Sequence, residues 1–346
     1  MCCLQTPLAL FSHSGYWACR AEIALIGREA KIRMSSSLPA RRSVARFPKL
    51  DLQPTYVTPA GRAYCADALA VLKQLPDDSI SLIMTSPPFA LIRQKAYGNV
   101  SHGDYIEWFM PFAEEFYRVL RPDGSFVVEI GGAWNSGSPT RSLYQYELVI
   151  RLCTMFKLAQ DFYWFNPSRL PTPAEWVTIK RTRVKDAVNP IWWLSKTENP
   201  HADNRQVLKP YSKSMKRLLR DGYDVAMRPS QHEIGPHFGK DNGGAIPPNM
   251  MSVPNTRSNE AYLRRCKAAG IAPHPARFPY EVPEFFIRFL TVEGQLVYDP
   301  FAGSNITGAA AEALGRRWIS TEIHAGYVEG SRLRFEEPAD QSRRAA

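Results

Sequence analysis

The chain is organised around the stretch Ser79-Ile80-Ser81-Leu82-Ile83-Met84-Thr85-Ser86-Pro87-Pro88-Phe89. The apolar run from Ile80 to Met84 predicts a buried strand of a parallel sheet. Pro87 and Pro88 end this strand, because they lack backbone N–H donors and hold φ near one value. The carbonyl groups at this point are therefore free to accept hydrogen bonds from a molecule outside the chain.

The residues on either side of the two prolines suggest what that molecule is. Ser86 precedes the prolines and Phe89 follows them. The Ser86 hydroxyl and a proline carbonyl can accept hydrogen bonds from an exocyclic amine, while the Phe89 ring stacks on a planar base. The alternative is a proline-containing turn that only ends a strand.

Length and composition set limits on the fold and the partner. A chain of 346 residues can bury a large core in one large domain or two. The net charge of +10 favours a polyanionic partner, although many basic proteins bind no nucleic acid. The six cysteines lack zinc-site spacing, so we expect reduced thiols and no metal. We expect a cytoplasmic protein, since no apolar run is long enough to cross a membrane.

The two ends of the chain look unlike the rest. Residues 1–50 are predicted to form a poorly ordered extension, in which Ser35-Ser36-Ser37 is typical of a linker and Met34 is a possible true start. The extension has no basic leader and is a poor signal peptide. A basic arm that contacts DNA is the alternative. Residues 335–346 are predicted to be a frayed tail.

Residues 51–195 are predicted to hold the catalytic part of the domain. Asp67 follows a short strand at 63–65 and opens a helix over 68–75. Its carboxylate could reach the adenine amine of a cofactor, or it could cap the helix, and both interpretations stay open. Further predicted elements are a helix capped by Asp104, a helix over 143–156, and paired strands over 162–167 and 189–195.

Glu129 is an acid in a predicted buried strand over 125–130. At the end of the sheet it could accept a hydrogen bond from Ser86 and take up the proton that a substrate amine loses. It could instead be a structural partner of a basic group.

Basic residues gather at two places in the second half of the chain. Four lie between the paired strands, where we expect phosphate contact rather than a solvated loop: Lys180, Arg181, Arg183 and Lys185. Residues 196–272 then lose regular periodicity and are rich in polar, basic, Pro and Gly residues. We predict a target-recognition region there that uses Arg228, His232 and Lys240, with a solvated insertion as the alternative.

Residues 273–334 contain a second functional pattern. A strand at 296–298 leads into a loop with Gly303, a helix, and a strand that ends at Glu322. This is the order of the first half of a nucleotide-binding α/β unit, in which glycine lets a ligand approach the backbone and the acid accepts from ribose hydroxyls. The loop lacks the G-x-G-x-x-G spacing of dinucleotide enzymes.

Several motifs together resemble one family. Ser86-Pro87-Pro88-Phe89, Asp299-Pro300-Phe301-Ala302-Gly303-Ser304 and His274-Pro275-Ala276-Arg277-Phe278-Pro279 are similar to motifs of the β group of DNA amino-methyltransferases that act on cytosine N4. The order of catalytic loop, recognition region and cofactor loop is also that of this group. One departure is Glu129, where the resemblance leads us to expect aspartate.

The resemblance implies a doubly wound, Rossmann-like α/β methyltransferase sheet in permuted order, with S-adenosylmethionine as cofactor. The implied catalytic residues are Ser86, Pro87, Pro88, Phe89 and Glu129. The implied cofactor contacts are Asp67, Pro275, Phe278, Asp299, Phe301, Gly303, Ser304, Asn305 and Glu322. The 274–279 stretch has a structural alternative, a proline-rich start to the helix that follows.

The implied reaction is methylation of N4 of a flipped-out cytosine in duplex DNA, with CAGCTG as the expected site. We expect a monomer that protects DNA from a separately encoded restriction endonuclease. Adenine-N6 methylation uses the same chemistry and is the nearest alternative. A catalytically inactive DNA-binding protein is the alternative of another class.

Overall fold

The computed structural model describes residues 47–90, 101, 103–222, 239–257 and 260–336. Most of the predicted N-terminal extension and most of the predicted tail lie outside these residues. Phe335, which we placed in the tail, instead stacks on Trp318 with 4.9 Å between ring centroids. Within the described part of the chain, no helix is both long and apolar enough to cross a membrane.

A nine-stranded sheet forms the centre of the fold, in the order β1-β2-β9-β8-β3-β4-β6-β5-β7. The five strands β2, β9, β8, β3 and β4 are parallel, as the sequence predicts, whereas β6 runs antiparallel to both β4 and β5. The strands span Tyr56–Val57 (β1), Gly61–Cys65 (β2), Ile80–Thr85 (β3), Leu120–Glu129 (β4), Lys157–Phe165 (β5), Val188–Ser195 (β6), Met250–Ser252 (β7), Leu296–Asp299 (β8) and Arg317–Glu322 (β9).

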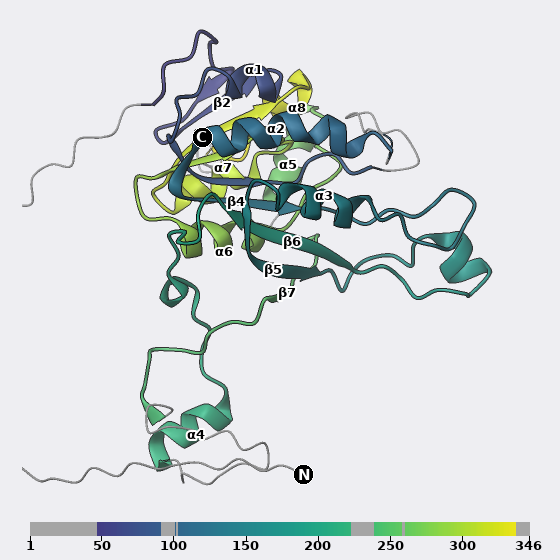
Figure 1. Cartoon of the computed structure of the whole chain (residues 1–346), viewed down its shortest axis with the longest axis vertical. Coiled ribbons are helices and arrows are strands. Elements are labelled where there is room, and N and C mark those ends of the chain that lie inside the picture. The colour runs from purple at the N-terminus through teal and green to yellow at the C-terminus, as the bar shows by residue number, and fades with distance from the viewer. Residues whose placement is uncertain (1–46, 91–100, 102, 223–238, 258–259, 337–346) are drawn as a thin grey trace, which may run out of the picture. The chain divides into compact units, whose positions relative to one another are not determined.

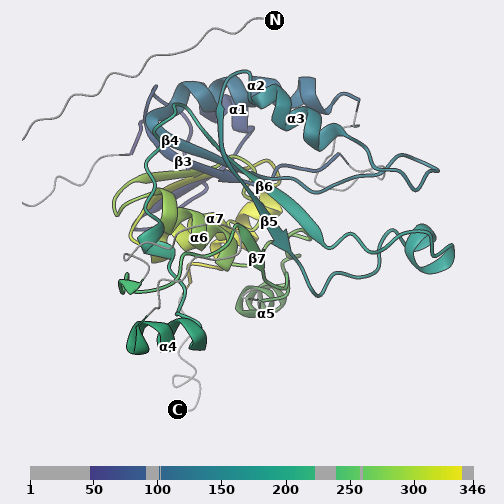
Figure 2. The same cartoon turned by 60° about the horizontal axis from the view of Figure 1, so that its bottom comes forward.

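Helices cover both faces of this sheet, so the fold has three layers. Figure 2 shows α1, α2 and α3 on one face, and α6 and α7 on the other. The helices span Ala68–Leu72 (α1), Tyr105–Val119 (α2), Tyr144–Leu152 (α3), Lys213–Asp221 (α4), Glu260–Ala269 (α5), Glu281–Leu290 (α6), Ile306–Ala313 (α7) and Ala325–Arg332 (α8). Each face has its own hydrophobic core.

Strand β3 is the shared wall of the two cores, and all six of its residues are buried. Because side chains alternate along a strand, Ile83 packs in the core beneath α1–α3 while Leu82 and Met84 pack in the core beneath α6–α8. A continuous apolar run is what a strand buried on both faces requires. The interpretation of residues 80–84 as such a strand is confirmed.

The sheet brings distant parts of the chain together. β3 pairs in parallel with β8, at Leu82 with Val297 and at Ile83 with Tyr298. The Ser86 loop and the Asp299 loop therefore leave neighbouring strands at the same edge of the sheet, although more than two hundred residues separate them. A doubly wound sheet places its ligands at such an edge.

Two predicted helices are shorter than expected. The helices over 68–75 and 143–156 end at Leu72 and Leu152. Beyond both ends some amide N–H groups bond to carbonyls three residues back, as in Leu75 to Leu72 and Met155 to Leu152, both at 3.0 Å. These tight last turns keep the apolar side chains buried without continuing the α-helix. Asp104 makes no side-chain capping bond to α2, contrary to the prediction.

Two segments project from the body of the domain (Figure 1). One lies between β5 and β6 and contains a π-helical turn at Glu175–Ile179. The other lies between β6 and β7 and contains a 3₁₀ turn at Asn204–Val207 and the helix α4. Both segments are the places where the sequence showed basic residues and weak periodicity.

Candidate active site

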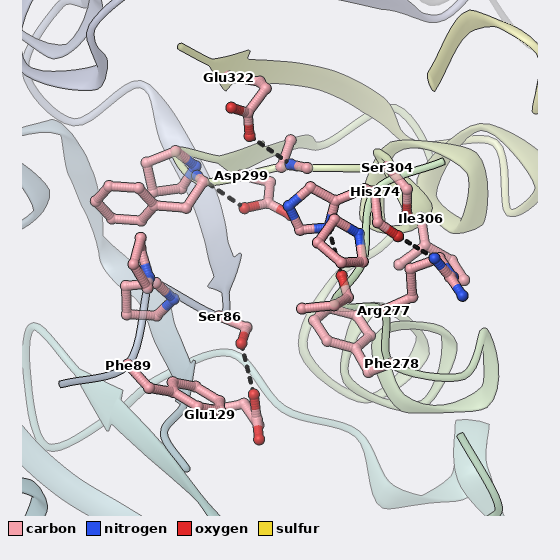
Figure 3. A pocket seen from close by; sticks show the side chains of 18 of the residues that line it. Ser86, Phe89, Glu129, His274, Arg277, Phe278, Asp299, Ser304, Ile306 and Glu322 are labelled. Atoms are coloured by element: carbon pink, nitrogen blue, oxygen red, sulfur yellow. Dashed lines mark hydrogen bonds between the residues drawn. The ribbon is translucent and has the colours of Figure 1, made fainter. Parts of the chain in front are cut away.

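A cavity of about 790 Å³ opens at the carboxyl ends of the central parallel strands. The loop after β3, the last residue of β4, the loop after β8 and the last residue of β9 all contribute to its wall, so the catalytic and cofactor motifs line one space (Figure 3). The predicted residues that line it are Asp67, Ser86, Pro87, Pro88, Phe89, Glu129, Pro275, Phe278, Asp299, Phe301, Gly303, Ser304 and Glu322.

Ser86 and Glu129 meet at one end of this cavity. The Ser86 hydroxyl donates to Glu129 Oε2 at 2.5 Å, and the Asn189 amide donates to Glu129 Oε1 at 2.5 Å. The predicted contact is confirmed, and Glu129 makes it while paired with Ile191 in the ladder between β4 and β6. Burial raises the pKa of Glu129, and the bonds from Ser86 and Asn189 partly offset that rise.

The two residues that end the Ser-Pro-Pro-Phe motif are held in place by the core. The Tyr105 hydroxyl donates to the Pro88 carbonyl at 2.9 Å. The Phe89 ring lies directly against Gly131, where an added Cβ would come within 2.2 Å of the ring. Gly131 is therefore required for the Phe89 ring to occupy its place beside the cavity.

Asp299 starts the loop after β8 and is almost fully buried. Its Oδ1 accepts from the Thr85 hydroxyl at 2.7 Å and from the Phe301 amide at 3.2 Å. Burial raises the pKa of Asp299 to about 6. The bond to Thr85 ties the cofactor loop to the strand that carries Ser86.

Glu322 holds the turn of the same loop. Its Oε2 accepts from the Gly303 amide at 3.0 Å, and its Oε1 accepts from the His324 amide at 2.9 Å. Gly303 has φ of +50°, and an added Cβ would come within 2.9 Å of the His274 ring. Both facts explain why this position is glycine.

Asn305 and Asp67, two of the predicted cofactor residues, both cap helices. Asn305 is absent from the cavity wall, because its side chain caps α7 by accepting from the Gly308 amide and also donates to the Tyr56 hydroxyl. These bonds give Asn305 a structural role, and its contact with the cofactor stays a prediction. Asp67 caps α1 by accepting from the Ala70 amide at 3.3 Å, and it also lines the cavity. Both interpretations of Asp67 are compatible with this placement.

Comparison with known proteins identifies the family. The N6/N4 methyltransferase family model, described as DNA methylase, matches residues 80–332. Type II methyltransferase M.PvuII of Proteus hauseri is 53% identical over 288 residues, which cover 82% of this chain and 86% of the relative. A solved PvuII DNA methyltransferase (cytosine-N4-specific) superposes with a TM-score of 0.70 at 44% identity, covering 86% of this chain and 93% of that one.

The chain belongs to this DNA methylase family. A more distant relative, the DNA adenine methyltransferase YhdJ of Escherichia coli strain K12, is 27% identical over 267 residues, covering 76% of this chain and 78% of the relative. The chain is thus a DNA amino-methyltransferase, and S-adenosylmethionine is its methyl donor.

The residues at the ends of β8 and β9 of this methyltransferase fit that cofactor. Each Glu322 oxygen already accepts one backbone hydrogen bond, and a carboxylate oxygen has room for a second, as ribose hydroxyls require. The Phe301 ring packs edge-on against Phe112 at 5.1 Å and lines the cavity as an apolar surface. Arg277 also lines the cavity, and its buried Nε has no hydrogen-bond partner among the described residues.

Those of the predicted DNA-binding residues that the structure describes are not part of the cavity wall. Lys180 pairs with Glu175 at 3.0 Å, and Arg183 pairs with Asp186 at 3.2 Å. Lys185 donates to the carbonyls of Pro167 and Arg169, so it also braces its own loop. Arg181 and Lys240 are exposed, while Arg228 and His232 lie outside the described residues.

One wall of the methyltransferase cavity was not predicted. Trp164, Asn166, Arg169 and Asn189 reach it from the ends of β5 and β6. Because these strands are antiparallel, the end of one and the start of the other lie at the same edge of the sheet. The available signal was the repeated Asn-Pro pair, at 166–167 and at 189–190.

Proposed function

We propose that this methyltransferase transfers the methyl group of S-adenosylmethionine to N4 of a cytosine at a specific site in duplex DNA. The observation that carries the proposal is the Ser86–Glu129 pair, which lines the same cavity as the Asp299–Ser304 loop and Glu322. The 44% identity to the solved cytosine-N4-specific PvuII DNA methyltransferase supports N4 as the target atom.

The substrate base must enter the cavity from the duplex. A base inside the stack is out of reach, so flipping it out costs a few kcal/mol that the site must offset. Phe89 offers a ring for stacking, and its seat against Gly131 fixes the ring before the base arrives. The cavity of about 790 Å³ has room for a base beside a cofactor.

Hydrogen bonds from the amine orient it for transfer. The Ser86 hydroxyl donates to Glu129, so its own lone pairs remain to accept from one amine hydrogen. The Tyr105 hydroxyl already engages the Pro88 carbonyl, and we expect the Pro87 carbonyl to accept from the other. Both bonds turn the nitrogen lone pair out of the ring system, and positioning of this kind provides much of the rate.

Bound S-adenosylmethionine would supply an electrophilic methyl group, whose C–S bond breaks to leave S-adenosylhomocysteine as the N–C bond forms, and the amine nitrogen would then lose one proton. Ser86 and Glu129 provide the path for that proton. Because burial raises the pKa of Glu129, its carboxylate is a stronger proton acceptor than an exposed glutamate. The proton then leaves Glu129 for water as product departs.

We further infer the biological setting from the resemblance to M.PvuII. The recognised sequence is CAGCTG, and methylation protects it from a cognate restriction endonuclease. The DNA contacts come from the recognition region over 196–272 and from four basic residues before it, Lys180, Arg181, Arg183 and Lys185. The enzyme acts as a monomer on the chromosome, in the cytoplasm.

The test is transfer of tritium from labelled S-adenosylmethionine to CAGCTG duplexes, with the product nucleoside identified by mass spectrometry. Wild type should form N4-methylcytosine, and Ser86→Ala should lose at least about a hundredfold in single-turnover rate while still binding cofactor. The matched control is Ser79→Ala, a half-buried serine that directly precedes β3 and lies outside the cavity wall.

Three other outcomes would change the conclusion. N6-methyladenine as product would move the target to adenine, as in the relative YhdJ. Label in another duplex sequence alone would remove the CAGCTG assignment. Cofactor binding with no label in any duplex would contradict the proposal.

A further inference from the structure

A chain of hydrogen bonds runs from the mouth of the cavity to Ser86. Arg169 Nη1 donates to Asn189 Oδ1 at 3.3 Å, Asn189 Nδ2 donates to Glu129 Oε1 at 2.5 Å, and Ser86 donates to Glu129 Oε2 at 2.5 Å. All four residues line the cavity. They come from different elements: the loop after β5, the start of β6, the end of β4 and the loop after β3.

The chemistry of Arg169 sets the direction of this chain. A guanidinium group has donors and no acceptor, so the Asn189 atom that faces it must be the oxygen. Asn189 therefore turns its NH₂ group towards Glu129, which must offer a lone pair and not a proton at Oε1. With Oε1 occupied in this way, Oε2 accepts from Ser86, and the Ser86 oxygen is left as an acceptor.

We propose that Arg169 and Asn189 are positioning residues that orient Glu129 as a double acceptor, so that Ser86 presents its lone pairs to the substrate amine. This inference rests on the proposed function, because it concerns the same amine. Without Arg169 the Asn189 amide could turn over, face Glu129 with its oxygen, and require a proton on that carboxyl group.

The surroundings of Glu129 indicate that Arg169 favours the ionised form of this carboxyl group. Glu129 is 1% exposed, and the positive charge of Arg169 opposes the rise in its pKa that burial causes. Tyr105 on α2 and Tyr144 on α3 also interact with Glu129, but burial raises the pKa of both well above the neutral range, so they stay uncharged. Arg141, which acts on Tyr144, is paired with Asp186 at 3.1 Å.

The loop that carries Arg169 is itself fixed. Lys185 donates to the Arg169 carbonyl at 3.1 Å and to the Pro167 carbonyl at 3.4 Å. Asn166, at the start of this loop, accepts from the Ser168 amide at 3.1 Å and from the Asn255 amide at 3.4 Å. The guanidinium thus projects into the cavity from a braced turn rather than from a free side chain at the surface.

The test measures single-turnover methylation at saturating DNA and cofactor, from about pH 5 to about pH 9, for wild type and Arg169→Met. The ionised Glu129 is required, so the rate falls on the acidic side. Without the positive charge of Arg169, the pH at which the rate falls on the acidic side of the profile, its acidic limb, should rise by about one unit. At a fixed pH on this limb the rate should then be about tenfold lower than that of wild type. Arg169→Lys should restore most of the shift.

Asn189→Asp provides an independent test. An aspartate at this position cannot donate to Glu129 unless the two carboxyl groups share a proton, so the acidic limb should again move up. The control for loss of one positive charge is Arg121→Met, at the opposite end of β4, where the wild-type limb should be kept. Cofactor affinity and the melting temperature of each variant show whether it has folded.

The outcomes separate this inference from the proposed function. If wild type forms no N4-methylcytosine, the proposed function fails. If wild type is active and Arg169→Met keeps its pH limb while DNA affinity falls, Arg169 contacts DNA and the positioning role is wrong. A shifted limb in Arg169→Met and Asn189→Asp, restored by Arg169→Lys, establishes it.

Discussion

The cavity edge of the sheet and the segment between β6 and β7 differ in almost every physical respect. At the cavity edge the side chains of Glu129 and Asp299 are buried and bonded to neighbouring strands. In the segment over 196–249, Gly244 is the one buried residue among those that the structure describes. Helix α4 has no buried residue at all.

We propose that this difference separates the part of the molecule that performs chemistry from the part that recognises DNA. Methyl transfer requires groups held within a fraction of an ångström, and packed strands provide this. Recognition requires donors and charges that DNA itself can order, and exposed loops provide that at low cost in stability. Helix α4 fits the second case, because Arg217 and Arg220 are exposed and pair with Asp221 on their own helix.

The first prediction concerns how much the burial of Asp299 at the cavity edge lowers the free energy of unfolding. Burial raises the pKa of Asp299 from 3.8 to about 6, so the folded state binds this proton more tightly than the unfolded chain does. Its contribution to stability is full below pH 3.8 and is lost as the pH rises through 6. Asp299→Asn keeps both accepted hydrogen bonds and should gain up to about 3 kcal/mol over wild type at neutral pH.

Urea unfolding of both proteins at about pH 4 and about pH 7 measures this change. The difference in free energy of unfolding between Asp299→Asn and wild type should be small at about pH 4 and large at about pH 7. The matched control is Asp51→Asn, an exposed aspartate whose effect should be close to zero at both values. If the free energy of unfolding differed between Asp299→Asn and wild type by the same amount at both pH values, Asp299 would not carry a destabilising buried charge.

The second prediction concerns the packing of the Phe89 ring against Gly131 at the same cavity edge. Gly131→Ala places a methyl group within 2.2 Å of the Phe89 ring, so the ring must move. Misplacement of a base-stacking group by about an ångström should lower the single-turnover rate about a hundredfold. Gly326→Ala, where no atom lies within 4 Å, is the control in the same assay. An unchanged rate would show that the position of Phe89 is unimportant.

The third prediction concerns the cofactor end of the cavity. Glu322→Gln keeps one oxygen but loses the charge that both the loop amides and a ribose would use. Titration calorimetry should show about tenfold weaker binding of S-adenosylmethionine, with the rate at saturation much less changed. Glu329→Gln on the exposed side of α8 is the control. A large loss of rate at saturating cofactor would assign Glu322 a catalytic role instead.

The smallest effect is expected in the exposed segment. Lys240→Ala removes one charge from a residue that makes no ion pair in the described part of the chain. DNA affinity should fall a few-fold, equally for all sequences, and the salt dependence should lose about one unit of slope. Anisotropy over a salt series measures both, with the exposed Lys267→Ala on α5 as control. A sequence-dependent loss would indicate base contact.

Much of the fold could be read from local patterns. Residues 80–84 form a largely apolar run that predicts a strand buried on both faces, and the structure confirms it. A glycine in a strand–loop–helix pattern predicted the loop after β8. Gly303 has the positive φ that such a turn needs. Helix ends were less predictable, because the buried tight turns after Leu72 and Leu152 look like helix in sequence.

The sequence by itself determined the residue types of the site, since Ser86-Pro87-Pro88-Phe89 and the Asp299–Ser304 loop are each contained in one short stretch. Only the tertiary structure decided which distant groups meet them. Asn189 reaches Glu129, and Arg169 reaches Asn189, because β6 runs antiparallel beside β4 and β5 runs antiparallel beside β6. Strand pairing is a long-range property of the folded sheet, and no local pattern specifies which strands become neighbours.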